Sequence, residues 1–410
     1  MAVTDSISVF AEGTFEEQIQ ELVFYIVRNQ DEERSVLLRP FQDAFKTENE
    51  KKSLAEDTEK RQNIFAMVMA EVKGLGDGSD KEIEGFFNLL FSHVLSLHLS
   101  DSPKTKEYVM QLLGTVTSAP PQHTAIKYRI LSNFFNALPK TSSLRYLVYN
   151  SLLDTALSND GIEVLQLSRA EVEKWLSEWD ISPEEKSTFL KSVVDAYTKS
   201  GQPTTSYEYS LLYVHSLLAT SEAAKAAALD AIATALRLPF TFDFDPLFKL
   251  DAVVAVKGHD LFSLLQVFLN GGLTEFKAWQ QSHSGVLEKF DLEVTQLERK
   301  IRLLTLASLG FQNVGQNVPY SKIAEILQVD VSEVEKWVID VIRAGLLSGK
   351  LSQTTQSLHI MRSTARTFER EQWEVLEKRM LAWKAGLAGV LEVVANARRQ
   401  NGVHGIPVAA

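Results

Sequence analysis

Residues 294–370 constrain the fold of this chain more than any other stretch. Apolar residues in 294–313 recur at spacings of three and four, which predicts an amphipathic helix. The same spacing in 320–328 predicts a short second helix. Gly315 and Pro319 stand between the two segments and mark a turn. The residues that define the two apolar faces are Val294, Leu297, Ile301, Leu303, Leu304, Leu306, Ile323, Ile326 and Leu327.

A third helix is predicted after a short turn. Asp330 with Glu333 can form a capping box, in which side chains satisfy the free backbone N–H groups at a helix start. Ser332 with Glu335 is the alternative pair. Gly345 is expected to end the helix, because glycine adopts the left-handed conformation found past a helix end. The side chains expected to be buried are Val334, Trp337 or Val338, Val341 and Ile342.

Two short extended segments, 346–351 and 357–361, follow this helix and are separated by a polar turn. Apolar and polar residues alternate in the second segment, as in a half-buried strand. A helix, a helix–turn–helix and a pair of strands together define a winged helix. The backbone of strand 346–351 or of strand 358–362 is expected to be able to pair with a neighbouring protein. The side chains expected at this edge interface are Leu346, Leu351, Leu358 and Ile360.

The charge of the third helix argues against DNA recognition. DNA affinity depends mainly on Lys and Arg side chains that neutralise phosphates, and base recognition needs Arg, Asn or Gln at the base edges. Residues 330–343 instead carry more acidic than basic side chains. The wing and the segment after it are more basic, so an RNA contact is an alternative to a simple solvated surface. The candidate RNA contacts are Lys350, Arg362, Arg366 and Arg370.

The composition is that of a soluble globular protein. A chain of 410 residues exceeds the size of one ordinary core, so at least two packed units are expected. The absence of cysteine excludes a disulfide framework and cysteine-ligated zinc, and it is compatible with a reducing compartment. The formal net charge of −11 argues against general affinity for nucleic acids or anionic membranes.

Neither a secretion signal nor a membrane span is expected. The N-terminus lacks a basic start followed by an apolar core. The longest apolar run, 86–99, is interrupted by polar residues and is too short to cross a bilayer. A cytoplasmic location is therefore predicted.

Helical periodicity extends through nearly all of residues 63–292, where strand signals are almost absent. Helix pairs of roughly 35 to 40 residues predict a solenoid of helical repeats, which buries a continuous core and presents long faces to partners. Before it, residues 1–62 are expected to hold one helix and a flexible charged segment. After it, a winged helix at 293–366, a long helix at 367–399 and a disordered tail at 400–410 are expected.

Capping boxes are predicted at four helix starts in the first half of the chain. They pair Thr14 with Glu17, Ser168 with Glu171, Ser182 with Glu185, and Thr205 with Glu208. Trp175 and Trp179 lie four positions apart, so they share one face of a predicted helix. One of them is expected to anchor a neighbouring helix and the other a partner.

The segment 367–399 contains no proline and carries an apolar seam with alternating spacings of three and four. Such a heptad pattern is typical of helices that pack in coiled coils or bundles. A helix of this length, roughly 50 Å, would extend beyond a small winged helix. It either folds back along the chain's own solenoid or joins helices of other chains through large aromatic anchors. The seam consists of Trp373, Leu376, Met380, Trp383, Leu387, Val390 and Val394.

No catalytic, cofactor or metal site is predicted. The eight histidines show no metal-ligand spacing. The glycine cluster at 73–80 lacks a preceding strand, and 345–352 lacks the glycine spacing and hydroxyl residue of a phosphate-binding loop. Asp243 and Asp245 are expected to form a turn before Pro246. The chain is therefore expected not to be an enzyme and to need no cofactor.

Several blocks of the sequence resemble the PCI family, whose members are scaffold subunits of the proteasome lid, the COP9 signalosome and eukaryotic initiation factor three. The resemblance covers most of the chain from about residue 120 onward, and the closer match is to members from the initiation factor. The blocks are LRYLVYNSLLDTA (144–156), KWLSEWDISPEEK (174–186), FDFDPLFKLDAVVAVKGHDLFSLLQVFLNGGL (242–273), WVIDVIRAGLLSGKLSQTTQ (337–356) and RTFEREQWEVLEKRMLAWK (366–384).

This resemblance implies a non-catalytic scaffold subunit with a PCI module at residues 206–375. The module would lie beside the modules of neighbouring subunits through the winged helices, and the last helix would enter a bundle shared with PCI and MPN subunits. The assembled factor binds the small ribosomal subunit during translation initiation. A scaffold subunit of the signalosome or proteasome lid is the first alternative, and an RNA-binding winged helix is the second.

Overall fold

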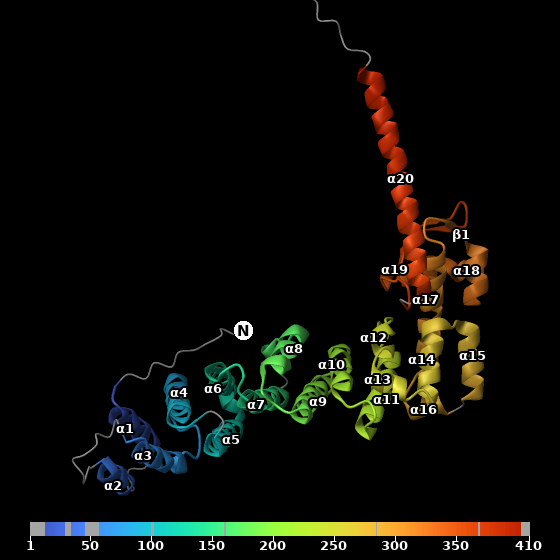
Figure 1. The fold of residues 1–410 in the computed structure, drawn as a ribbon. Helices are drawn as coiled ribbons and strands as arrows, with labels where there is room; N and C mark the ends of the chain where they lie inside the picture. The colour runs from blue at the N-terminus through green and yellow to red at the C-terminus, as the bar shows by residue number, and fades with distance from the viewer. Residues whose placement is uncertain are drawn as a thin grey trace, which may run out of the picture. The chain divides into compact units, whose positions relative to one another are not determined.

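The computed structural model describes residues 13–28, 34–45, 57–99, 102–159, 161–283, 285–367 and 370–402. These residues are mostly helical, with one three-stranded antiparallel sheet in the C-terminal part of the chain (Figure 1). The chain divides into two compact units, Met1–Leu217 and Leu218–Ala410. The predicted fold class, helical repeats followed by a winged helix with a small wing and a long terminal helix, is confirmed.

The first unit consists of helices joined by short connections around one continuous apolar core. Consecutive helices pack against one another, most extensively α9 with α10 and α6 with α7. The α-helices are α1 (Phe15–Ile26), α2 (Arg34–Phe45), α3 (Thr58–Glu71), α4 (Asp80–Leu97), α5 (Pro103–Thr117), α6 (Thr124–Ala137), α7 (Leu144–Ser158), α8 (Arg169–Glu178), α9 (Pro183–Lys199) and α10 (Pro203–Ser216). Two short 3-10 helices, η1 (Pro121–His123) and η2 (Ile162–Leu165), lie in the connections.

Two of the predicted capping boxes form with both of their hydrogen bonds. At α1, the Thr14 N–H donates to Glu17 Oε2 at 2.7 Å, and the Glu17 N–H donates to Thr14 Oγ1 at 3.4 Å. At α9, Ser182 and Glu185 make the same reciprocal pair at 2.9 and 3.2 Å. These helix starts are therefore encoded by local sequence, as expected for capping boxes.

The other two predicted boxes differ in the structure. Ser168 accepts the Glu171 N–H at the start of α8, but the Glu171 carboxylate accepts the Ser168 hydroxyl and not its backbone N–H. The box predicted for Thr205 and Glu208 is wrong, because α10 already begins at Pro203. The fixed φ of proline suits the first position of a helix, so Thr205 lies inside the helix and cannot cap it.

Trp175 and Trp179 both belong to the core of the first unit. Their rings stack with centroids 5.9 Å apart, and both are buried against Phe135. Tyr149 and Phe189 complete the aromatic cluster. The prediction that one of these tryptophans anchors a partner is therefore wrong, because neither indole is accessible.

Buried basic side chains close helix C-termini in this unit. The last carbonyls of a helix lack intrahelical partners and carry a partial negative charge, so a nearby cation stabilises them. Lys127 on α6 donates to the carbonyls of Thr117 and Ala119 at the end of α5. Arg145 on α7 donates to the Leu138 carbonyl just past α6 at 3.1 and 2.9 Å.

The second unit contains the sheet and the longest helices of the described chain. Its elements are α11 (Glu222–Arg237), α12 (Asp245–Phe248), α13 (Asp251–Ala255), α14 (Asp260–Asn270), α15 (Leu273–Ser282), α16 (Val286–Lys289), α17 (Val294–Gln312), β1 (Asn317–Pro319), α18 (Tyr320–Leu327), η3 (Val331–Glu333), α19 (Val334–Arg343), β2 (Leu347–Ser352), β3 (Ser357–Ser363) and α20 (Arg370–Gly402).

Lys300 repeats the capping arrangement inside the second unit. Its ammonium group, on α17, donates to the carbonyls of Ala235, Leu236 and Leu238 at the end of α11, at 2.7, 3.2 and 2.7 Å. The side chain is buried, and burial lowers the pKa of Lys300 to about 7. Lys300 thereby fixes the end of α11 on α17, a contact between residues more than sixty positions apart.

The winged helix is present, with one strand more than predicted. The strands run in the order β1-β3-β2, and both pairings are antiparallel. The third strand, β1, consists only of Asn317, Val318 and Pro319, which is too short for the alternation that identifies a strand in a sequence. The sheet and α17 to α19 enclose a common core that contains Leu358 and Ile360.

The start of α19 corrects two details. Neither predicted capping box forms, because the helix is entered through the 3-10 turn η3, in which the Glu333 N–H donates to the Asp330 carbonyl at 2.9 Å. Glu335 instead accepts from Gln353 at 3.0 Å and from the Tyr320 hydroxyl at 3.3 Å.

The buried face of α19 and the position where the helix ends agree better with the predictions than its start does. Val334, Val338 and Val341 are buried, whereas Trp337 and Ile342 are half-buried, so Val338 and not Trp337 occupies the core position. The guanidinium group of Arg302 lies 5.4 Å from the centre of the Trp337 ring. Gly345 has φ +73° immediately after the helix, which confirms the predicted glycine stop.

Gly310 allows the sheet to pack closely on α17. A Cβ atom at this position would lie 2.6 Å from Leu347 Cδ1 and 3.0 Å from Ser363 Oγ. The Ser363 hydroxyl donates to the Ala307 carbonyl of the same helix at 2.7 Å. Because residue 310 has no side chain, both wing strands can pack directly against the helix.

Candidate interaction surfaces of the C-terminal unit

Arg366 anchors the segment that leads into α20. Its guanidinium group donates to the carbonyls of Gly271 at 2.6 Å, Leu304 at 3.0 Å and Phe268 at 3.3 Å, and to the Thr305 hydroxyl at 3.2 Å. Burial lowers the pKa of Arg366 to about 10, so the group is charged at neutral pH. The prediction of Arg366 as an RNA contact is wrong, because its donors are already bound inside the protein.

Helix α20 carries the predicted apolar seam on an uncovered surface. Trp373, Met380 and Trp383 are 61%, 60% and 68% exposed, which is unusual for such large apolar side chains. The remaining seam residues, Leu376, Leu387, Val390 and Val394, are exposed as well. No helix of the described part of the second unit covers this face. The seam therefore offers a continuous apolar stripe along a helix of 33 residues.

Arg379 connects α20 to the winged helix without covering the seam. Its guanidinium group donates to the Phe311 carbonyl in the last turn of α17 at 2.6 Å, and it lies 4.9 Å from the centre of the Phe311 ring. This is another basic side chain at a helix C-terminus, like Lys300 and Arg366. Residue 379 lies between seam positions along the helix but projects to the side of the stripe.

The length and composition of residues 372–399 would also permit a membrane span. The apolar part of this helix contains Lys384 and Glu392. A charged side chain near the centre of a membrane helix costs about 2.5–3.5 kcal/mol. The heptad seam gives this helix one apolar stripe bordered by charged residues, a pattern that favours packing against other helices over immersion in lipid.

The wing offers only one of the two strand edges that were predicted. Strand β3 lies between β1 and β2, so the prediction of an open edge at 358–362 is wrong. Leu346, Leu358 and Ile360 are buried in the domain core, and Leu351 is half-buried, so these side chains support the strands from within. In the described residues no strand pairs with the outer edge of β2, which leaves its backbone available to another chain.

The remaining basic residues of the wing are on the surface. Lys350 and Arg362 are exposed on β2 and β3. Arg370 is exposed at the start of α20 and pairs with Glu374 at 3.1 Å. Lys350, Arg362 and Arg370 therefore remain the predicted RNA contacts that the fold leaves accessible.

Within the described ranges, no group of three or more His, Asp or Glu side chains is placed to hold a metal ion. Lys300 has the most strongly lowered pKa of the described lysines, but the hydrogen bonds of its ammonium group all go to backbone carbonyls. Its perturbed pKa therefore reflects a structural cap and not an activated nucleophile.

Comparison with known proteins agrees with this architecture. The model of the PCI domain family matches residues 280–362, which extend from the end of α15 through the winged helix to β3. The predicted resemblance is confirmed, and the chain is a PCI-domain protein. A second family model, described as eIF3 subunit M, C-terminal helix, matches residues 366–394. This match begins at the anchoring residue Arg366 and includes the whole seam.

Full-length relatives identify the family within this class. A Phaeosphaeria nodorum protein named eukaryotic translation initiation factor 3 subunit M is 32% identical over 406 residues, covering 94% of this chain and 88% of the relative. Proteins of the same name from Aspergillus terreus and Dictyostelium discoideum are 31% and 30% identical, covering 96% and 78% of this chain and 88% and 80% of the relatives. The chain belongs to the family of eukaryotic translation initiation factor 3 subunit M.

Proposed function

We propose that this chain is a non-catalytic scaffold subunit of translation initiation factor 3, and that α20 joins it to a helical bundle formed with other subunits. The exposed seam of α20 carries this proposal, together with the names of the relatives. A helix with a heptad stripe is the element that helical bundles use for association. Because the seam side chains from Leu376 to Val394 are exposed and no described helix of the second unit covers them, another chain is the natural source of a partner helix.

The side chains of the seam can supply substantial binding energy. A buried aromatic side chain removes about 150–250 Å² from water, which is worth roughly 4–6 kcal/mol at about 25 cal/mol per Å² as an upper bound. Trp373 and Trp383 are the largest side chains of the stripe and lie among smaller apolar residues. Interfaces concentrate their energy in such aromatic anchors. We therefore assign the central contacts of the bundle to the seam.

The domain boundaries are part of the same proposal. Residues 63–292 would form the helical-repeat body, 293–366 the winged helix and 367–399 the bundle helix, with the PCI module extending over 206–375. Arg366 lies at the last of these junctions, where its hydrogen bonds tie the start of the bundle helix to α14 and α17. The predicted flexible segment lies largely, and the predicted disordered tail almost entirely, outside the described residues.

The proposed partners are other PCI and MPN subunits of the same factor. The outer edge of β2 would pair with a neighbouring subunit, because an open strand edge can extend a sheet across an interface. The assembled factor, and not this chain alone, would then bind the small ribosomal subunit in the cytoplasm. In this role the chain supplies spacing and attachment points and needs no cofactor.

The seam is tested by purifying tagged full-length chain from nuclease-treated cell extract and identifying the proteins that accompany it. Trp383→Ala with Leu387→Ala is expected to remove most co-purifying initiation-factor subunits while leaving the far-UV circular dichroism spectrum unchanged. Both side chains are exposed, so their loss should not unfold the chain. The matched control is Lys378→Ala with Glu392→Ala on the opposite face of α20, which should retain the subunits. Full recovery of subunits by the double seam variant would show that the seam is not the interface.

The same purification separates the alternatives. Recovery of signalosome or proteasome-lid subunits in place of initiation-factor subunits would keep the architecture and change the complex. An RNA contact through the wing would appear as salt-sensitive RNA binding that Lys350→Glu with Arg362→Glu abolishes. The two cations are exposed on adjacent strands, which is the observation that favours testing them together.

A further inference from the structure

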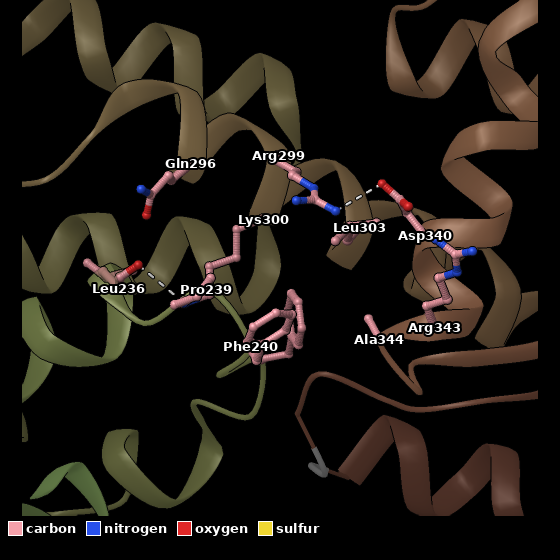
Figure 2. Close-up of a pocket in the computed structure, with 11 residues that line it drawn as sticks. Leu236, Pro239, Phe240, Gln296, Arg299, Lys300, Leu303, Asp340, Arg343 and Ala344 are labelled. Carbon is pink, nitrogen blue, oxygen red and sulfur yellow. Dashed lines mark hydrogen bonds and ion pairs between the residues drawn. The ribbon is translucent and has the colours of Figure 1, made fainter. Parts of the chain in front are cut away.

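A pocket in the second unit lies apart from the seam of α20 and the edge of β2. It is formed by the end of α11 and the loop after it, by α17 and by α19, and it has a volume of about 220 Å³ (Figure 2). The residues with mainly apolar contact surface are Leu236, Pro239, Phe240, Phe242, Leu303 and Ala344. This volume is below the roughly 300–1,000 Å³ of sites for drug-sized ligands, and it suits one or two amino-acid side chains.

Lys300 on α17 fixes the start of the loop that forms one wall of the pocket. The Lys300 side chain donates to the carbonyls of Ala235, Leu236 and Leu238, and its nitrogen lies 5.0 Å from the centre of the Phe244 ring. The next residues therefore leave α11 in a fixed direction. Figure 2 shows the Phe240 ring between this loop and the helix that carries Asp340 and Arg343.

Phe240 is the most exposed large residue of this wall. Its side chain is 83% exposed, although the neighbouring Leu238 is buried. A phenylalanine on a fixed backbone loses little conformational entropy when a partner covers it, so it is a preorganised anchor for binding. The exposed ring and the apolar pocket together form a surface that gains from contact with another apolar side chain.

The rim of the pocket is positively charged on an acidic protein. Arg299 and Asp340 neutralise each other through an ion pair of 3.0 Å. Arg343, in the last turn of α19, is exposed and has no acidic partner among the residues that the structure describes. The chain as a whole has a formal charge of −11, so this arginine gives the rim of the pocket a charge opposite to the net charge of the protein.

We infer that this pocket binds a short acidic segment of a partner protein. A leucine- or phenylalanine-sized side chain of that segment enters the pocket beside Phe240, and a nearby carboxylate pairs with Arg343. Charge complementarity selects an acidic segment over a basic one. It also favours peptide over RNA, because a single unpaired arginine neutralises one phosphate only and Asp340 opposes a second. This site is additional to the bundle contact of α20.

The inference is tested by selecting a phage-displayed library of random short peptides on the full chain. The counter-selection uses the variant Phe240→Ala with Arg343→Glu, and its fold is checked by far-UV circular dichroism. Both side chains are on the surface, and the two single substitutions serve as replacements if the double variant unfolds. Enriched peptides are expected to combine a large apolar residue with Asp or Glu, and to bind the variant about tenfold more weakly or worse.

Two controls make the result specific. Lys336→Glu changes an exposed charge on α19 that does not line the pocket, and it should leave peptide binding unchanged. Trp383→Ala with Leu387→Ala should also leave it unchanged, which separates this site from the proposed bundle contact. Selection of basic or uncharged peptides, equal binding to the pocket variant, or no enrichment would overturn the inference. An oligouridine probe that binds the chain but not the pocket variant would assign the site to RNA and overturn it as well.

Discussion

Replacing Lys300 with methionine removes the amino group that caps α11 while keeping an unbranched apolar side chain in its place. In the folded protein the Lys300 amine lies within hydrogen-bonding distance of three carbonyls and is 3% exposed. A buried carbonyl left without a partner costs about 1–3 kcal/mol. At pH 9 the amine is neutral and donates two hydrogen bonds, so methionine leaves two buried carbonyls without a donor. We therefore expect the substitution to lower the free energy of unfolding by about 2–4 kcal/mol at this pH.

The effect should depend on pH in a defined direction. Burial lowers the pKa of Lys300 to about 7 in the folded state, from an ordinary value of 10.5. At pH values between these two pKa values the unfolded chain binds more protons than the folded chain, so the stability of the native protein rises with pH. Integrating the difference in bound protons from pH 7 to pH 9 gives about 2 kcal/mol, at 1.36 kcal/mol per unit of pKa. The advantage of Lys300 over methionine should therefore be about 2 kcal/mol smaller at pH 7.

The assay is urea unfolding of both proteins at pH 7, 8 and 9, with hydrogen exchange and mass spectrometry reporting on residues 294–312. Exchange in this helix isolates the second unit, since a chain of two units need not unfold in one step. Lys336→Met, at an exposed site, is the control and should show no such pH dependence. A constant difference between Lys300 and methionine over this range would refute the reasoning. It would mean that the carbonyls keep the ammonium group charged despite its burial.

Two further predictions concern glycine positions in the second unit and a buried histidine in the first. Gly310→Ala is expected to cost about 1–3 kcal/mol, because its methyl group overlaps Leu347 and Ser363 and well-packed cores resist added volume. At Gly386 an added Cβ would meet no atom within 4 Å, so Gly386→Ala should instead stabilise its helix. The Gly386 variant should therefore unfold at a higher temperature than the Gly310 variant, and the opposite order would contradict this prediction. His93 is buried and its pKa is lowered to about 4 by burial, so the unfolded state binds the extra proton and stability should fall as pH drops from 6.5 to 4. His93→Leu should flatten that part of the acid-unfolding curve, measured by circular dichroism, and an unchanged curve would exclude His93 as its cause.

Most helices could be predicted because their signals are local. The apolar spacing in α17, α18 and α20 and the capping pairs at α1 and α9 depend on residues within a few positions of each other. Predicted helix starts were wrong where a second local signal outweighed the capping box. Pro203 moved a helix start ahead of Thr205, and a 3-10 turn replaced the box expected at Asp330. Strand β1 was missed because three residues carry too little pattern.

The long-range contacts could not be predicted from any spacing. Lys300 meets carbonyls more than sixty positions away, and Arg366 meets two that are more than ninety positions away. In the sequence both residues are ordinary cations in helical or loop segments. The sequence therefore predicts a surface contact for Arg366 and gives no signal for the contacts of Lys300, Phe240 and Arg379. A carbonyl carries no sequence signal, since every residue has one.

The sequence by itself determined which segments are helical, where the winged helix lies, that α20 has an apolar seam, and which family blocks the chain shares. These properties follow from periodicity and local capping, which act along the chain. Only the tertiary structure decided which apolar surfaces are covered. Packing buried Trp175, Trp179, Leu358 and Ile360, and left Trp383 and Phe240 exposed. Burial depends on neighbours brought together from distant parts of the chain, so the fold decided which apolar residues lie in the core and which remain exposed.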